Sequence, residues 1–307
     1  MEKAGNVGTA ERTDGVSTAE DLAAVRGIFN EVAGVHVAQV RDVMLELRYG
    51  DASPAWIEAT RPALKSLRAM AGAMDLTDLC NALDEFCVTV DSTVANRAQV
   101  GDDGKAELLR RYQRLIDLIP QAFELDAERD RREPIIVESL LFQVDGVERL
   151  IIDKLFAVGL NRLDALVRAT ADEIAVVSGV RLELAAKIAE QFRSYRSKGA
   201  TTISAPDPAA ERRELADLLI VLSLQNDDYN HAASSWTDDA KVRKRELLKS
   251  REHTFQKIKV TLARLGERDQ LARLEKLPFA ERIAALDRYL STQSPSRQPA
   301  SGQPTRT

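Results

Sequence analysis

The sequence predicts an all-α protein, and three features support this class. The 307 residues are 44% hydrophobic and 30% charged, so the chain has apolar material for packed cores and charge for solubility. Aromatic residues reach only 5%, and 15 glycines and 10 prolines are few for a sandwich or barrel, which needs many tight turns. Apolar residues recur instead at threes and fours, as in amphipathic helices. At roughly 100–200 residues per domain, we expect two or three domains.

Residues 18–130 are predicted to form an antiparallel bundle of four helices, preceded by a small, polar, disordered tail at 1–17. Thr18 opens the first helix in the manner of a capping box. Ser53 and Pro54 supply an N-cap and a first helical residue for the second helix. The third helix starts near Leu76, and the fourth follows a turn at 101–104. The apolar stripe of the first helix is predicted at Leu22, Val25, Phe29, Val32, Val40, Val43 and Leu47.

Beyond the bundle, charged residues 126–133 and Pro134 predict a domain boundary. Residues 135–198 alternate short helical segments with glycine-centred turns, and 199–208 read as a linker rich in small residues and proline. A C-terminal helical module is predicted at 209–292, with a long helix from about 237 to 265 and a disordered tail at 293–307. Leu248, Phe255 and Ile258 belong to an apolar seam in that helix, which we expect to pack within the chain rather than in a dimer.

The second helix carries a motif that resembles a known family. Its run Arg61-Pro62-Ala63-Leu64-Lys65-Ser66-Leu67-Arg68-Ala69-Met70-Ala71-Gly72 is similar to the central motif of histidine phosphotransfer (HPt) domains, which reads His-x-Leu-Lys-Gly with a later glycine. The resemblance rests on Leu64, Lys65, Gly72 and the apolar spacing, and covers residues 20–120. It implies an antiparallel bundle whose exposed face docks receiver domains.

The chain departs from this motif at the position that carries the chemistry. Pro62 stands where the family has its phospho-accepting histidine, and an amide-locked ring nitrogen is no nucleophile. A proline inside a helix also costs about 3 kcal/mol unless the helix kinks or starts nearby. We therefore expect a module that binds partners without reacting. The expected partner-binding face consists of Glu58, Arg61, Pro62, Lys65 and Arg68.

Residues 151–195 carry a doubled pattern that looks like tandem helix-hairpin-helix (HhH) units, a family of nucleic-acid-processing modules. Its two glycine turns lie twenty residues apart, separated by a capping box at Thr170 to Glu173. A working hairpin presents backbone N–H groups to a phosphate, but the usual second glycine is replaced in both units, and 145–200 carries only +1 net charge. A protein-docking scaffold and weak duplex DNA binding therefore both remain open. The candidate nucleic-acid contacts are Gly159, Asn161, Arg162, Gly179, Arg181 and Lys187.

Charge, cysteine and terminal patterns add further expectations. Residues 241–264 hold nine basic and two acidic residues. We interpret this run as a solvated helix face, and the alternative is attraction of an anionic partner, with 241–251 as further contacts in the DNA hypothesis. Cys80 and Cys87 lie seven residues apart, about 10.5 Å along a helix and too far for a disulfide. Neither has partners at metal-ligand spacing, so we expect reduced cysteines and no metal or cofactor. The N-terminus lacks a secretory signal and Leu215–Leu224 is too short to span a bilayer, which predicts a cytoplasmic protein.

Three functional hypotheses follow, ordered by how many motifs support them. The first is a non-catalytic signalling adaptor or scaffold in a two-component or chemosensory phosphorelay, with a receiver domain or histidine kinase as partner. The second is a sequence-independent DNA-binding protein that acts through the HhH module. The third is a phosphotransferase that uses His36, which instead is expected to pack in the bundle. Since the sequence shows no nucleophile–base pair, phosphate-binding loop or dinucleotide motif, an enzyme is the least expected class.

Overall fold

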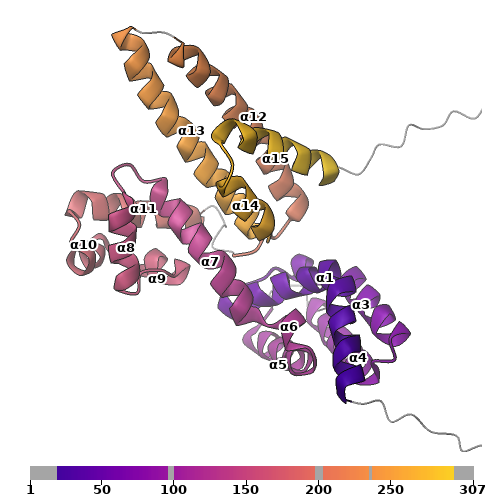
Figure 1. Ribbon diagram of the computed structural model, residues 1–307. Coiled ribbons are helices and arrows are strands. Elements are labelled where there is room, and N and C mark those ends of the chain that lie inside the picture. Colours follow the sequence, from indigo (N-terminus) through magenta and orange to yellow (C-terminus); the bar gives the residue numbers. More distant parts are fainter. Residues whose placement is uncertain (1–18, 96–99, 198–202, 235–236, 294–307) are drawn as a thin grey trace, which may run out of the picture. The chain divides into compact units, whose positions relative to one another are not determined.

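The structure, a computed structural model, describes residues 19–95, 100–197, 203–234 and 237–293. Within these ranges every regular element is a helix, as the composition predicts (Figure 1). The chain divides into two compact units, one of residues up to Val40 with Ile57–Phe123, the other of Arg41–Trp56 with the residues from Glu124 onward. The predicted tail at 1–17 lies outside the described residues, and so does the predicted tail at 293–307 except for Gln293, which ends a helix.

The first unit consists of helices that bury apolar side chains. Its helices are α1 (Ala19–Tyr49, up to Val40), α2 (Pro54–Glu58), α3 (Arg61–Ala73), α4 (Thr77–Ala95), α5 (Asp102–Leu118) and α6 (Pro120–Phe123). Fully buried Tyr112 lies between Phe86 and Phe123, with ring centroids 5.8 Å from each, and its hydroxyl donates to the Phe123 carbonyl at 2.9 Å. This hydrogen bond removes the cost of burying the Tyr112 hydroxyl.

Three predictions for this unit need correction. The stripe of α1 is shifted, because Leu22 and Val32 are exposed while Ala33 and Val37 are buried beside Phe29. The predicted second helix is divided into α2 and α3. The predicted turn at 101–104 is only a helix start, since Gly101 is the N-cap of α5 and the residues after it are helical. Ser53 does cap α2, accepting from the Trp56 N–H at 3.2 Å.

The second unit begins with a helix where a boundary was predicted. Helix α7 (Leu125–Phe142) runs through residues 126–133 and contains Pro134. One side of this charged segment is in the interior, because Glu128, Arg132 and Glu133 are buried and pair with charges within the unit. Their pairing explains why charged side chains can be buried there, while Asp130 and Arg131 stay exposed.

Two pairs of helices follow α7, each pair joined by a turn that contains a glycine, and we call them the first and second hairpins. They consist of α8 (Arg149–Ala157) with α9 (Leu163–Arg168), and α10 (Ala171–Ser178) with α11 (Leu182–Ser197). Helix α10 packs on α11, while α8 packs on α10 and α9 packs on α11. Gly159 and Gly179 stand at the turns with φ of +87° and +67°, conformations that side-chain-bearing residues rarely adopt. The predicted capping box is present, with Thr170 and Glu173 bonded reciprocally.

The remaining helices pack on a common apolar core. They are α12 (Pro208–Ala233), α13 (Asp238–Arg264), α14 (Arg268–Glu275) and α15 (Phe279–Gln293), with α12 and α13 side by side as a long hairpin (Figure 1). Phe255 and Ile258 of the predicted seam are buried in the packing within the chain, but Leu248 is 46% exposed and Leu247 is buried in its place. The described part of the predicted linker, Ile203–Pro208, begins with three buried residues.

Candidate functional site on helices α3 and α4

The start of α3 places Pro62 where it costs least. Thr60 is the N-cap and Pro62 lies within the first turn, where its missing N–H has no intrahelical acceptor. The anticipated helix-breaking penalty is therefore absent. Pro62 is exposed and lies on the outer side of α3, opposite the buried Leu64 and Leu67.

The predicted partner-binding residues share this outer side and divide into paired and unpaired charges. Arg61 pairs with Glu58 at 2.8 Å and with Asp91 of α4 at 2.7 Å, and Arg68 pairs with Asp84 of α4 at 3.2 Å. These pairs are at least one-third exposed and contribute little stability, but they fix where the cations stand. Exposed Lys65, between them, makes no ion pair with a described residue.

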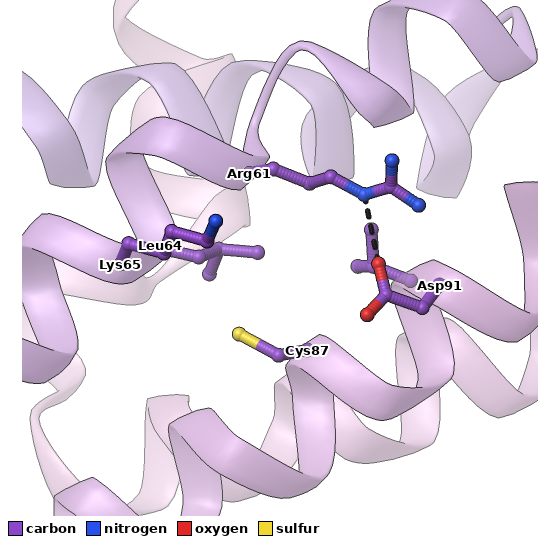
Figure 2. Close-up of a pocket in the computed structure, with 6 residues that line it drawn as sticks. Arg61, Leu64, Lys65, Cys87 and Asp91 are labelled. Carbon is purple, nitrogen blue, oxygen red and sulfur yellow. Dashed lines mark ion pairs between the residues drawn. The ribbon is translucent and has the colours of Figure 1, made fainter.

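A hollow of about 370 Å³ lies between α3 and α4 at this face. Figure 2 shows Arg61 reaching across it toward Asp91, with the Cys87 sulfur facing the same space. Leu64 and Val90 give it an apolar floor, while Arg61, Lys65 and Asp91 supply charge at the edge. An apolar hollow with a few charges at its rim is suited to receive a side chain of a partner.

The only thiol at this hollow is poorly nucleophilic. Burial raises the pKa of Cys87, and the Asp84 and Asp91 carboxylates raise it further, against the opposing charge of Lys65. A thiol needs its thiolate form to react, so Cys87 stays protonated near neutral pH. Among the described residues Cys80 and Cys87 are both free cysteines, and no group of three metal-ligating side chains lies together.

The residues that α4 contributes to this face were not predicted from the sequence. Asp84, Cys87 and Asp91 recur at threes and fours, so they lie on one face of a helix, and they match the spacing of Arg61, Lys65 and Arg68 on α3. That complementary charge spacing is the signal that predicts the interhelical pairs. His36, proposed as a replacement nucleophile, is half-buried on α1 and does not line the hollow.

The first predicted nucleic-acid hairpin is occupied by a carboxylate of the protein itself. Arg162 pairs through Nη1 with Asp130 at 2.8 Å and Glu133 at 2.9 Å. The Leu163 N–H, at the start of α9, donates to Oε1 of the same Glu133 at 2.7 Å. Glu133 thus lies where a phosphate would lie at this helix start. Arg162 as a DNA contact stays a prediction. Arg181 and Lys187 of the second hairpin are exposed.

Comparison with known proteins gives one match. A stretch of 126 residues is 29% identical to the chemotaxis protein CheA of Rhizobium meliloti (strain 1021). The chain is distantly related to a chemotaxis protein. The matched stretch is 41% of this chain and spans only 17% of that relative. No protein family matches the chain, and no solved structure matches it.

Across the described helices, none combines the length and apolar character needed to cross a bilayer.

Proposed function

We propose that the chain is a non-catalytic signalling adaptor of the chemotaxis type, and that its α3/α4 face docks a receiver domain or a histidine kinase. The observation that carries the proposal is the exposed proline in the place of the phospho-accepting histidine, on a face that keeps its cations and its hollow. The distant relationship to CheA supports a role among proteins of this signalling class. In this proposal the module binds as a phosphotransfer domain does and transfers nothing.

The electrostatics of the face favour an anionic partner surface. Asp91 and Asp84 hold Arg61 and Arg68 in place, which leaves Lys65 as the cation available for a partner carboxylate. A partner presenting an apolar side chain to the hollow and an acidic group to Lys65 matches both features. The rim charges set orientation and association rate, and burial of the apolar contact contributes the affinity.

A binding experiment with the full chain tests this function. Receiver domains and histidine-kinase domains are titrated against the immobilised protein, and Lys65→Glu is expected to weaken binding roughly tenfold by reversing the free charge of the face. Lys154→Glu, at an exposed cation of α8 in the second unit, is the matched control and leaves binding unchanged. Equal weakening by both variants, or no partner from either class at high micromolar concentration, contradicts the proposal.

The DNA-binding alternative receives less support from the geometry. Its first hairpin is closed by Glu133, so only Arg181 and Lys187 of the named cations remain for phosphate contacts. Two cations on this module are few, because phosphate contacts supply most of the affinity for non-specific DNA. We therefore propose protein docking as the role of both hairpins.

A further inference from the structure

Residues Ile203–Ala205, between α11 and α12, form a buried non-helical segment with bends at Ile203 and Ser204, which we call the strap. All three residues are at most 4% exposed, although they belong to no helix. The N–H groups of Ile203 and Ser204 both donate to Oε1 of Glu46 on α1, each at 2.8 Å. The Ala205 N–H donates to the carbonyl of Arg264 at 3.0 Å. The strap is thus held by one side chain at two of its three N–H groups.

Glu46 is buried without a cation of its own. It is 3% exposed, and no arginine or lysine among the described residues forms an ion pair with it. Arg132 is committed to Asp42 at 2.9 Å and to Glu128, and Arg264 is committed to Glu211 at 2.6 Å. Asp42 on α1 and Arg264 on α13 act electrostatically on Glu46, and Glu46 in turn acts on Tyr195 of α11. Arg132 on α7 pairs with Asp42 and Glu128, and Glu211 on α12 pairs with Arg264.

These surroundings favour the neutral form of the carboxyl group. Burial raises the pKa of Glu46 to about 7, the charge of Asp42 adds to the rise, and the two strap N–H groups and Arg264 oppose it. When the strap opens and water reaches Glu46, the group returns toward its ordinary pKa of 4.5. The closed strap therefore holds a proton that the open strap releases at any pH between these two values.

We propose that Glu46 is a proton-controlled latch on the Ile203–Ala205 strap, which holds it when protonated and holds it less strongly when ionised. The sign follows from the linkage between proton binding and opening. Below about pH 4.5 both states are protonated and the strap is most firmly closed. As the pH rises to about 7 the preference for the closed state falls, in total by roughly 300-fold, and above 7 it stays at its lower value. Both carboxyl forms accept the two N–H bonds, so the latch weakens without breaking.

Amide hydrogen exchange of the full chain tests the latch. Protection of the strap amides, corrected for the intrinsic pH dependence of exchange, is expected to fall by roughly 30-fold between about pH 5.5 and 8. Glu46→Gln keeps an acceptor oxygen and carries no charge, so its strap protection is expected to stay flat and to exceed that of the wild type at pH 8. Glu183→Gln, at an exposed carboxylate of α11, is the control and follows the wild type.

A pH-independent wild-type strap, or a Glu46→Gln strap that loses protection as the wild type does, overturns the proposal. A carboxyl titration of the wild type by ¹³C NMR gives a second measurement that needs no variant. A Glu46 signal that titrates near pH 7 supports the latch, and one that titrates near 4.5 overturns it. Neither measurement involves the α3/α4 face, so its outcome is independent of the proposed adaptor function.

Discussion

Pro62 decides what the α3/α4 face can do, and its position in the first turn of α3 makes it structurally inexpensive. A histidine at the same position would project from the same exposed surface, one turn before Lys65. In the proposed adaptor, the loss of phosphotransfer rests on one side chain, while Arg61 and Arg68 still pair with α4. The role of this position can therefore be tested by placing a histidine there.

We predict that Pro62→His makes the chain a phosphoacceptor. With a histidine-kinase domain and radiolabelled ATP, the variant is expected to gain acid-labile, base-stable label, because an exposed imidazole beside a free lysine meets the chemical requirement. The wild type is expected to stay unlabelled. Label on the wild type that disappears in His36→Ala would show that the bundle reacts through another residue.

Gly266 is a second residue whose identity the fold requires. It follows α13 with φ of +77°, and a Cβ there would lie 2.8 Å from Nη2 of Arg132. Arg132 is itself buried and held by Asp42, Glu128 and the Arg264 carbonyl, so it cannot move aside cheaply. The glycine thus satisfies both the backbone conformation and the close approach of the guanidinium.

Gly266→Ala is predicted to destabilise the second unit by about 1–3 kcal/mol, measured by urea denaturation followed by circular dichroism. Gly179→Ala is the matched control, because its φ of +67° imposes similar backbone strain while no atom lies within 4 Å of the added Cβ. We expect Gly266→Ala to lower the free energy of unfolding more than Gly179→Ala does. Equal losses of unfolding free energy in the two variants would mean that the contact with Arg132 does not contribute to the destabilisation.

At the scale of single helices, local sequence signals were reliable where they acted on neighbouring residues. The N-cap Ser53 and the capping box of Thr170 with Glu173 are present as predicted. Long-range pairing explains the failures: α7 continues through 126–133 because Arg132 and Glu133 find partners far along the chain. No local pattern specifies such partners, and the same holds for the burial of Ile203–Ala205 by Glu46.

Removal of the α10 cap is predicted to loosen the second hairpin. Thr170→Ala loses the hydroxyl that accepts from the Glu173 N–H, which is expected to cost about 0.5–2 kcal/mol in urea denaturation. Thr170→Ser keeps the hydroxyl and is expected to retain most of the stability. If both substitutions are equally destabilising, the methyl group of Thr170 matters more than its hydrogen bond.

The first hairpin provides a prediction about DNA. Because Arg162 is paired with Asp130 and Glu133, Arg162→Glu is expected to leave duplex binding unchanged in fluorescence anisotropy, whether at about 50 or 200 mM salt. If the protein binds duplex DNA weakly, Arg181→Glu is expected to lower that affinity. A loss of salt-dependent binding with Arg162→Glu alone would restore the DNA hypothesis for this hairpin.

For the whole molecule, composition and periodicity were enough to predict the all-α class, and the HPt-like motif located the face on α3. The hollow itself could not be predicted from α3 alone, because half of its lining comes from Cys87, Val90 and Asp91 of α4. A site between two helices depends on how they pack. The adaptor hypothesis therefore depends on a juxtaposition that only the folded chain shows.

Alkylation of Cys87 tests the account most directly, since this thiol faces the hollow while Cys80 is buried. The full chain is treated with a maleimide above neutral pH, where the raised pKa of Cys87 still permits reaction, with and without a bound receiver domain. If the receiver docks at the α3/α4 face, Cys87 is modified several-fold more slowly in the complex, and its rate does not change when a non-binding receiver is added. A complex that forms while Cys87 reacts at its free rate would contradict docking at the α3/α4 face.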